Sequence, residues 1–337
     1  MKDYQHTMNA ELPHLPNFIS ILGETRTAQF IECKQTPVSF DPSTSTDALW
    51  KIHNDALHHT DDQTRPFHQS LLDLKIELAS RLYRACCFCE HRCGVDRREK
   101  TGKCGAKESR IASEFLHFGE EPMLVPSYTV FFSGCTFHCV FCQNWDISQQ
   151  SCGAFIEPAN LASLIEQRKR QGARNVNWVG GDPTSNLLYI LRVLNETQSN
   201  LPQIWNSNMF CSMETMKLLQ GVMDVYLTDF KYGNDSCARR LSSIDRYTPI
   251  VQRNHRLAYM NGEVIVRHLV LPHHGSCCSR PILQWIKENI PKAAVNIMPQ
   301  YRPEYHADDY EEIAQPISRE EYLEIRDYAE TLGLLLV

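Results

Sequence analysis

The sequence predicts an α/β protein whose largest part is an open partial TIM barrel of about six strand–helix units. Two observations carry this expectation. From about residue 116 onward, strand-like apolar runs alternate with helical runs, and connections long enough to hold a helix imply parallel strands. Only six such units fit into the chain, which is too few for a closed barrel of eight strands. An N-terminal extension and a cysteine-rich segment precede the barrel.

We expect three parts along the chain. Residues 1–80 form a partly helical extension, which begins polar and irregular and has short apolar runs near Phe18 and Leu49 that can dock on the barrel. A helix from Ser70 to Tyr83 carries leucines at helical spacing. Residues 81–115 form a cysteine-rich, metal-binding segment, and residues 116–337 form the barrel.

The units of the barrel are expected at defined positions. The strands are placed at 127–132, 175–179, 203–207, 223–230, 263–271 and 294–299. The helices are placed at 158–171, 184–197, 212–220, 235–244, 279–289 and 318–332. Ser318 and Glu321 form a capping-box pattern, and Pro158 and Pro281 lie near the starts of their helices, which supports these boundaries.

Composition limits the classes of function. The 34 Lys and Arg residues against 40 Asp and Glu give a formal charge of −6, so we expect no nucleic-acid partner. No apolar run approaches the roughly 18 residues that span a bilayer, and the N-terminus lacks the apolar core of a signal peptide. We therefore expect a cytoplasmic protein without a membrane partner. In that setting the 14 cysteines indicate metal ligands and free thiols rather than disulfides.

Three cysteines stand at the end of the first predicted strand, where parallel α/β folds bind their ligands. Cys135, Cys139 and Cys142 have the spacing C-x3-C-x2-C. Three thiolates at this spacing can hold a [4Fe-4S] cluster and leave one iron open to a substrate. The alternative is a zinc site, which needs a fourth ligand such as His138 or Cys152.

This motif, with Phe141 before its last cysteine and Asn144 just after it, resembles the signature of the radical S-adenosylmethionine (SAM) superfamily. The resemblance implies that Cys135, Cys139 and Cys142 hold the catalytic [4Fe-4S] cluster and that SAM binds its open iron. It also implies reductive cleavage of SAM to methionine and a 5'-deoxyadenosyl radical, which abstracts a hydrogen atom. Phe141 and Asn144 would then border the SAM site.

The ends of the second and third predicted strands extend the resemblance. Gly180, Gly181, Asp182 and Pro183 resemble the superfamily's GGEP-type motif, with Asp in place of the commoner Glu, and two glycines permit close approach of the backbone to a ligand. An ordinary strand-to-helix turn is the alternative interpretation. Asn206 and Asn208 suit the ribose and carboxylate of SAM, or else they satisfy loop backbone. The resemblance assigns all six residues to cofactor binding.

The fourth and fifth predicted strands carry charged residues. Asp229 and Lys231 resemble the Asp-x-Lys segment of pyruvate formate-lyase activating enzyme, which implies a cation site for Asp229 and an approach to SAM for Lys231. A solvated loop pair is the alternative. Arg267 lies in an apolar strand, where an unpaired charge is costly, so we expect it to face the barrel interior and meet a carboxylate. Lys231 and Arg267 are the catalytic candidates besides the three cysteines.

A second cysteine group precedes the barrel. Cys86, Cys89, Cys93 and Cys104 have the spacing C-x2-C-x3-C-x10-C, and four thiolates at this spacing can hold zinc or an auxiliary iron-sulfur cluster. Free cysteines without metal are the alternative. The remaining scattered cysteines, among them Cys237, Cys277 and Cys278, are expected to be ordinary small apolar residues.

Residues from about 80 to 337 resemble an uncharacterised branch of radical SAM proteins related to pyruvate formate-lyase activating enzyme. The resemblance implies an oxidoreductase that activates or modifies a protein partner and receives its electron from a flavodoxin or ferredoxin. A radical SAM enzyme acting on a small molecule or peptide is the first alternative. The second, from another class, is a zinc-stabilised binding module without catalysis.

Overall fold

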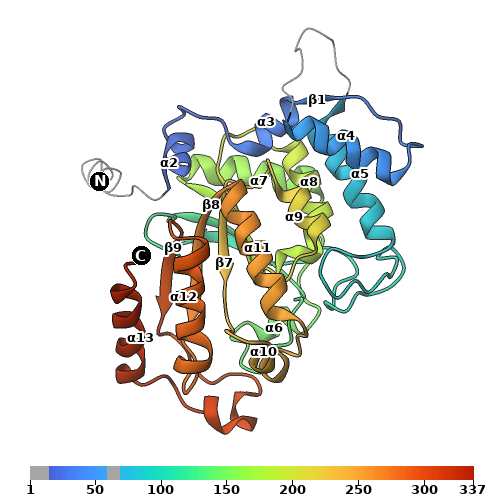
Figure 1. Ribbon diagram of the computed structural model, residues 1–337. Helices are drawn as coiled ribbons and strands as arrows, with labels where there is room; N and C mark the ends of the chain where they lie inside the picture. Colours follow the sequence, from blue (N-terminus) through green and yellow to red (C-terminus); the bar gives the residue numbers. More distant parts are fainter. Residues whose placement is uncertain (1–14, 59–68) are drawn as a thin grey trace.

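The core of the protein is an eight-stranded sheet with strand order β10-β9-β8-β7-β6-β5-β4-β3 (Figure 1). The computed structural model describes residues 15–58 and 69–337. The strands span Ile111–His117 (β3), Ser127–Phe132 (β4), Asn175–Gly180 (β5), Gln203–Ser207 (β6), Val225–Asp229 (β7), Glu263–Leu269 (β8), Ala294–Met298 (β9) and Leu335–Leu336 (β10). A small antiparallel pair, Pro37–Val38 (β1) and Gln69–Ser70 (β2), lies in the N-terminal extension.

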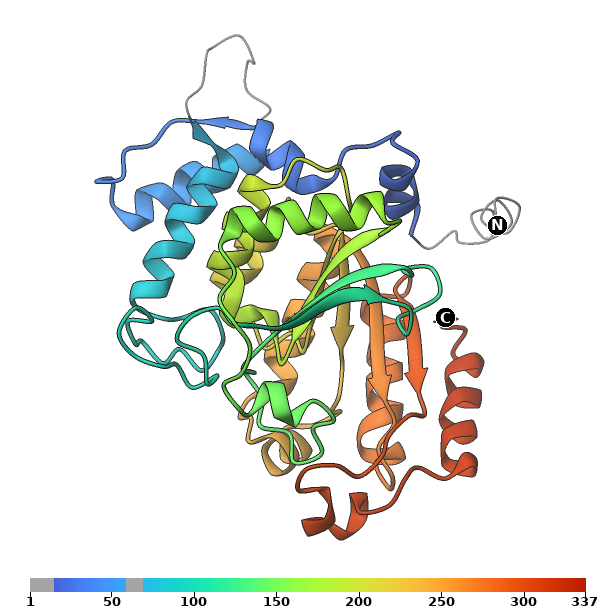
Figure 2. The same ribbon diagram turned by 180° about the vertical axis from the view of Figure 1, so that it is seen from behind.

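The predicted fold class is confirmed. The six predicted strands are β4 to β9, and all of them pair in parallel with their sequence neighbours. Two edge strands were not predicted: β3 pairs antiparallel with β4 as a long hairpin arm (Figure 2), and β10 pairs in parallel with β9. Because β3 and β10 are opposite ends of the strand order, the barrel is open between them.

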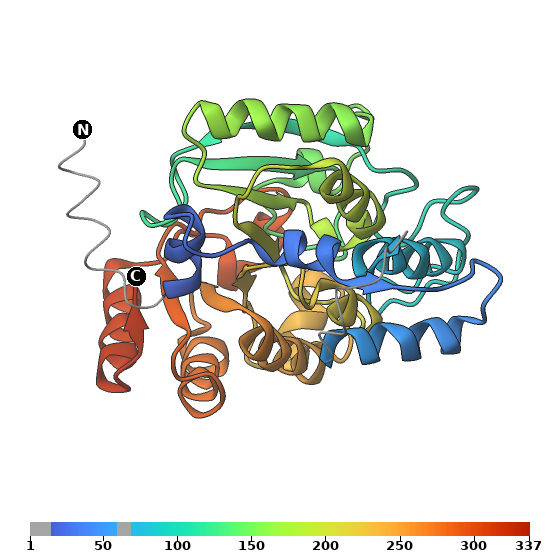
Figure 3. The same ribbon diagram turned by 90° about the horizontal axis from the view of Figure 1, so that it is seen from above.

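Helices follow the strands and cover the outer face of the sheet (Figure 3). They span Pro158–Arg170 (α7), Leu187–Glu196 (α8), Met213–Leu219 (α9), Asp235–Ser242 (α10), Tyr247–Asn261 (α11), Arg280–Asn289 (α12) and Arg319–Thr331 (α13), with the short Trp145–Ser148 (α6) after the cysteine loop. The helix expected at 184–197 begins with a 3-10 turn, Pro183–Asn186. α11 was not predicted, because Pro249 and few apolar positions obscure its period.

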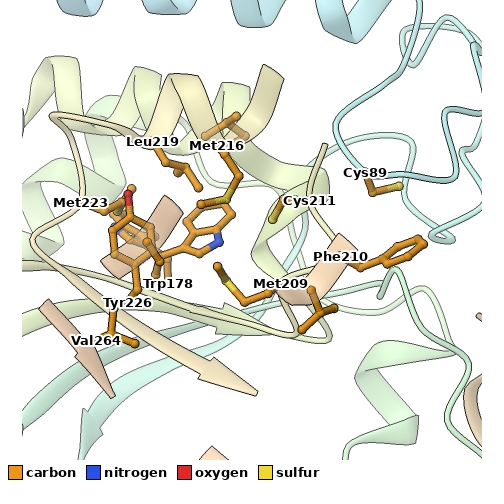
Figure 4. Packing of buried hydrophobic residues seen from close by; sticks show 14 of the residues in the cluster. Cys89, Trp178, Met209, Phe210, Cys211, Met216, Leu219, Met223, Tyr226 and Val264 are labelled. Carbon is orange, nitrogen blue, oxygen red and sulfur yellow. The ribbon is translucent and has the colours of Figure 1, made fainter. Parts of the chain in front are cut away.

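Strand alternation divides the apolar residues between two cores. Trp178 and Tyr226 point outward and pack with Met216 and Leu219 of α9 (Figure 4). The inner face instead carries a smaller cluster that joins five strand residues to Phe18 and to Met123 and Leu124 of the loop before β4. The strand residues are Ile204, Val225, Leu227, Ile265 and Ala294. This inner cluster closes the barrel at the amino ends of its strands.

The N-terminal extension is more ordered than the sequence indicates. It contains the helices Pro16–Leu22 (α2), Gln29–Gln35 (α3), Thr46–His58 (α4) and Leu71–Arg84 (α5), of which only the last was placed from its period. The carboxylate of Glu263 accepts hydrogen bonds from the backbone N–H groups of Asn17 (2.7 Å) and Phe18 (2.9 Å) and so caps α2. The extension therefore plugs the barrel at the end opposite α6 and α10 (Figure 1).

Among the described residues, none of the helices combines the length and the apolar character needed to cross a membrane. The expected division of the chain at residues 80 and 115 stays a prediction. β3 crosses the second of these boundaries, since it begins at Ile111 within the cysteine-rich segment.

Candidate active site

A cleft opens at the carboxyl ends of the strands, and it holds roughly 980 Å³ of empty space, part of it open to solvent. Most of the predicted site residues line it, namely Cys135, Cys139, Phe141, Cys142, Asn144, Gly180, Gly181, Asn206, Asn208, Asp229, Lys231 and Arg267. Asp182 and Pro183 do not.

The cysteine loop leaves β4 and is held by side-chain donors at each sulfur. The Ser242 hydroxyl, at the end of α10, donates to Cys139 Sγ at 2.9 Å. The Ser148 hydroxyl lies 3.1 Å from Cys142 Sγ. The Asn208 amide donates to Cys135 Sγ at 3.7 Å. Hydrogen bonds to sulfur tune the potential of a cluster that thiolates hold, so these donors belong to the chemistry of the loop.

The spacing of the three sulfurs fits a cluster better than a single ion. Around one tetrahedral zinc, with Zn–S bonds of about 2.3 Å, sulfurs lie about 3.8 Å apart. Among the described residues, the one group of three or more ligand atoms that all lie within 4.8 Å of one another does not include Cys135, Cys139 or Cys142. Thiolates that bind different irons of a cube lie farther apart, so the loop suits a [4Fe-4S] cluster.

Burial raises the pKa values of the loop cysteines and so disfavours their thiolate forms, while nearby groups lower the pKa of Cys139. Burial raises the pKa of Cys139 to about 11, while the Lys231 ammonium and the Ser242 hydroxyl lower it. Burial also raises the pKa of Cys135, with Asp182 adding to the rise. Metal binding must therefore displace protons from buried thiols, which makes loading of the site favourable at higher pH.

The two glycines at the end of β5, Gly180 and Gly181, are required by the packing of the cysteine loop. A Cβ atom on Gly181 would lie 2.1 Å from the carbonyl oxygen of Gly134, and one on Gly180, whose φ is +127°, would lie 2.1 Å from the backbone N of Phe132. Gly181 N also donates to Phe132 O at 2.9 Å. The loop of the first cysteine and the glycine turn are thus packed backbone to backbone.

Asp182 lies beneath the cleft. Its carboxylate, 1% exposed, accepts hydrogen bonds from Thr184 N (2.9 Å), the Ser207 hydroxyl (2.9 Å) and Asn208 N (3.1 Å). Burial raises its pKa, and these hydrogen bonds lower it. Asp182 therefore ties the end of β5 to the end of β6 and acts as a positioning residue. Pro183, the first residue of the 3-10 turn, is buried with it.

The two asparagines differ. Asn208 is locked, because its Nδ2 donates to Thr136 Oγ1 at 2.8 Å and its Oδ1 accepts from Phe210 N at 3.0 Å. Asn206 lines the cleft with a buried Nδ2 that has no hydrogen-bond partner in the described part of the chain. A buried free donor is costly. Asn206 is thus the residue of the pair that is prepared to bind a ligand.

Asp229 and Lys231 form an ion pair on the wall of the cleft. Lys231 Nζ lies 2.7 Å from Asp229 Oδ2, and its backbone N donates to the Tyr247 hydroxyl at 2.8 Å. Burial lowers the pKa of Lys231, but Asp229 and Cys139 outweigh it, and the net direction is upward. The ammonium is therefore charged beside the cysteine loop.

Arg267 faces the barrel interior and meets carboxylates, as its strand position indicates. Its guanidinium binds Glu121 twice at 2.8 Å and also pairs with Glu120. Glu121 accepts a further hydrogen bond from Asn296 at 2.9 Å. Burial raises the pKa of Glu121, yet the hydrogen bonds and charge of Arg267 give a net lowering. This ionic layer separates the cleft from the apolar plug below.

The cleft also contains residues that sequence analysis missed. They are Phe137, Gln143, Ser148, Val179, Ser207, Leu269 and Met298. Strand alternation alone could have found three of them, since Val179, Leu269 and Met298 share the parity of the inward residues on their strands. Ser148 and Ser207 carry no such signal, because tertiary packing of α6 and of the β6 end brings them in.

Two cysteines of the second cysteine group contact a buried arginine. Arg97, 1% exposed, donates through Nη1 to Cys104 Sγ (3.6 Å) and Cys86 Sγ (3.7 Å), while its Nε and Nη2 have no partner among the described residues. Cys89 is also buried, and burial raises its pKa. Cys93 Sγ lies 3.9 Å from Cys86 O. Among the described residues, no three of these sulfurs lie within 4.8 Å of one another.

Comparison with known proteins places this site in a family. The Radical SAM superfamily model matches residues 129–276. Over 336 residues the chain is 44% identical to the uncharacterized protein MJ0674 of Methanocaldococcus jannaschii, covering 96% of this chain and 99% of that protein.

Solved structures show more distant likeness. SuiB of Streptococcus suis, bound to precursor peptide SuiA, has a TM-score of 0.43 and 14% identity over 60% of this chain and 45% of its own. Methylornithine synthase (PylB) has a TM-score of 0.45 and 16% identity over 62% of this chain and 63% of its own. The chain spans less than two thirds of either protein. On the family model, which matches residues 129–276, the chain belongs to the radical SAM superfamily.

Proposed function

We propose that this protein is a radical SAM oxidoreductase that abstracts a hydrogen atom from a protein partner, in the manner of the activating enzymes of glycyl radical enzymes. Cys135, Cys139 and Cys142 would hold the cluster. When bound, the [4Fe-4S] cluster and SAM supply reductive cleavage of SAM to methionine and a 5'-deoxyadenosyl radical. The residues of the chain bind, orient and shield these groups.

Four residues are proposed to position SAM. The free Nδ2 of Asn206 donates to an oxygen of the cofactor, and the backbone around Gly180 and Gly181 allows close approach. Lys231 adds a positive charge beside the cysteines, which favours the SAM carboxylate. Phe137 and Phe141 exclude water from the cysteine side of the cleft, because both side chains are at most 4% exposed.

The observation that favours a protein partner is an aromatic rim. Trp145, next to the cleft residue Asn144, stacks on Tyr305, with ring centroids 5.7 Å apart and planes 13° from parallel. Tyr305 is 41% exposed. Its segment is tied to the cysteine loop, since His306 N donates to Val140 O at 2.8 Å. Aromatic side chains fixed beside a cleft are typical of protein interfaces.

We also propose an auxiliary iron-sulfur cluster at Cys86, Cys89, Cys93 and Cys104. The buried guanidinium of Arg97 has no carboxylate partner among residues 15–58 and 69–337, and an anionic cluster would balance its charge. No three of these sulfurs lie within 4.8 Å of one another in the described part of the chain, which fits a cluster better than one zinc ion. Cys135 N donates to Cys104 O at 3.0 Å, so this centre would lie next to the cysteine loop and could relay the electron of a flavodoxin or ferredoxin.

One experiment separates a protein substrate from a small molecule. Cells of the protein's own source are grown in D2O medium, and their extract is divided by ultrafiltration into macromolecules and small molecules. Each fraction is added to anaerobic, reconstituted enzyme with SAM and flavodoxin, and the 5'-deoxyadenosine formed is analysed by mass spectrometry. The proposal predicts deuterium transfer from the macromolecular fraction and its loss after protease treatment.

The alternatives give different results in the same experiment. Transfer from the filtrate would mean a small-molecule or peptide substrate. Absence of 5'-deoxyadenosine from every fraction, together with zinc and no iron in the purified protein, would support the zinc-stabilised binding module. The Cys139→Ala variant, which lacks one cluster ligand, is the control for deuterium that arises without the enzyme.

A further inference from the structure

Three cysteines that are far apart in the sequence meet on the outer side of the barrel. Cys237 lies in the first turn of α10, and Cys277 and Cys278 lie in the turn Gly275–Ser279 before α12. The Sγ atoms of Cys237 and Cys277 are 3.9 Å apart, as are those of Cys277 and Cys278. All three sulfurs lie within 4.8 Å of one another. None of them lines the active-site cleft.

These separations are those of thiolates around a single metal ion. With metal–sulfur bonds of about 2.3 Å, sulfurs are about 3.8 Å apart in a tetrahedral site and about 4.0 Å apart in a trigonal one. Thiolates select soft cations such as Zn²⁺ and Cu⁺. A disulfide would require an S–S distance near 2.05 Å, and cluster thiolates bound to separate irons lie farther apart.

A hydrogen-bond donor lies beside the sulfurs, where it would stabilise negative charge on thiolates. Asn234 Nδ2 points at Cys237 Sγ (3.3 Å) and Cys278 Sγ (3.9 Å), and it donates to Cys277 O at 2.9 Å. Gly233 approaches the same turn so closely that a Cβ atom on it would lie 2.7 Å from Cys277 O. One side-chain donor, the amide of Asn234, thus faces two of the three sulfurs.

Exposure of the three residues gives the group a closed side and an open side. Cys278 is buried, Cys237 is half-buried and Cys277 is exposed. An ion can therefore enter from solvent, and water or another ligand can complete its coordination, as at three-ligand zinc sites.

We propose that Cys237, Cys277 and Cys278 bind one thiophilic metal ion, Zn²⁺ or Cu⁺, with an open position toward solvent. Binding displaces one proton from each thiol that coordinates, and the three protons pass to solvent. No oxidant or reductant is involved.

The metal ion would fix the position of α10, a helix that contacts the cysteine loop of the active site. The other end of α10 holds the cysteine loop, because Leu241 O accepts from Val140 N at 2.9 Å and the Ser242 hydroxyl donates to Cys139 Sγ. The start of α10 follows the segment that carries Asp229 and Lys231. The metal would thus join α10 to the turn before α12 and hold the helix against the cysteine loop.

The test is metal content of the full-length protein, purified and reconstituted with iron under anaerobic conditions. Each protein is incubated with Zn²⁺ in one arm and with Cu⁺ in the other, passed over a desalting column, and analysed for zinc, copper and iron per chain. The variants are Cys277→Ala and Cys237→Ala. Cys152→Ala is the matched control, since Cys152 is a half-buried cysteine outside the group.

The wild type and the control should retain one more zinc or copper per chain than either site variant, with iron unchanged. The arm with the greater retention identifies the ion. X-ray absorption at that metal's edge should show three sulfur neighbours near 2.3 Å. Because Cys277 is exposed, its loss should leave the fold intact, and unchanged iron content checks this.

Equal zinc and copper in the wild type and Cys277→Ala would overturn the proposal. So would a Cys237–Cys277 disulfide found by alkylation and mass spectrometry in the anaerobically purified protein, since a disulfide removes two of the ligands. Loss of this metal in Cys277→Ala and not in Cys89→Ala would separate the site from the second cysteine group.

Discussion

The cysteine loop at 135–142 and the cysteine segment at 86–104 are neighbours, joined by the hydrogen bond from Cys135 N to Cys104 O, yet they are built differently. The loop has three cysteines, neutral donors at its sulfurs and a cleft in front of it. The segment has five cysteines, four of them at the predicted ligand spacing, and a buried guanidinium that contacts Cys86 and Cys104. The loop, with three ligands and an open side, suits a cluster that binds a substrate. The segment, with four candidate ligands and a buried cation, suits a metal centre that is closed to substrates.

The largest expected effect on activity comes from disturbing the packing of the cysteine loop. Gly181→Ala places a Cβ atom 2.1 Å from Gly134 O, so the loop must shift. We expect a loss of about 2–4 kcal/mol in unfolding free energy and a more than 100-fold fall in 5'-deoxyadenosine formation. Gly23→Ala is the control, because its nearest neighbour would be 3.5 Å away. Normal activity in Gly181→Ala would mean that the loop is not fixed by this contact.

The largest expected effect on stability comes from the ionic layer beneath the cleft. Arg267→Met leaves Glu120 and Glu121 without their cation, which should cost about 3–5 kcal/mol at pH 7. Arg280→Met removes an exposed pair with Glu324 and should cost less than about 1 kcal/mol. Urea unfolding of both variants measures the difference.

The pH dependence of this layer should change sign. In the wild type the pKa of Glu121 is lowered, so its stabilising contribution is present above its unfolded pKa near 4.5 and is lost as pH falls through the folded pKa. In Arg267→Met, burial without the cation raises the pKa of Glu121, so stability should increase as pH falls from 7 to 5. Decreasing stability of the variant over that range would contradict this account.

Iron binding at the cysteine segment should depend on Arg97. Arg97→Met removes the charge beside Cys86 and Cys104, and we expect less iron at the segment and slower turnover with flavodoxin as reductant. Turnover with dithionite, which can reduce the loop cluster directly, should change by less than about 3-fold. Arg98→Met alters the exposed pair with Asp96 and is the control. Equal iron in both variants would remove the proposed role of Arg97.

The smallest effect concerns one donor in the loop. Ser242→Ala removes the hydrogen bond to Cys139 Sγ, and since such bonds stabilise the reduced cluster, the reduction potential should fall by some tens of millivolts. Activity should decrease a few-fold. Spectroscopic redox titration measures the shift, with the exposed Ser243→Ala as control. An upward shift in potential would be inconsistent with the assigned donor.

Local patterns were sufficient to predict the main sheet. β4 to β9 match their predicted ranges to within a few residues, because each is an apolar run bounded by polar turns. The edge strand β3 has exposed residues such as Phe115 and an irregular register at Ser113, so it carries no apolar run. The short helices α2 and α3 are held by Glu263 and Asp224, carboxylates more than 190 residues away. Sequence period cannot reveal such caps.

The candidate site was predicted where its residues follow motifs or strand parity. The inward direction of Arg267 followed from its strand, but its partners Glu120 and Glu121 lie in an irregular loop without any pattern. Asp182 was expected at the cofactor and does not line the cleft, because its buried carboxylate is bound by Ser207 and Asn208. Cys237 and Cys277, expected as ordinary apolar residues, are 40 positions apart, and only the fold brings them together.

The most direct test of the central claim is 5'-deoxyadenosine formation by anaerobically reconstituted protein with SAM and a strong reductant, in wild type and Cys139→Ala. Radical SAM chemistry at the cysteine loop predicts product from the wild type and none above background from Cys139→Ala, while Cys152→Ala keeps wild-type activity. Equal product from wild type and Cys139→Ala, or no product from a wild type that carries about four irons at the loop and has the deuterated macromolecular fraction present, would contradict it.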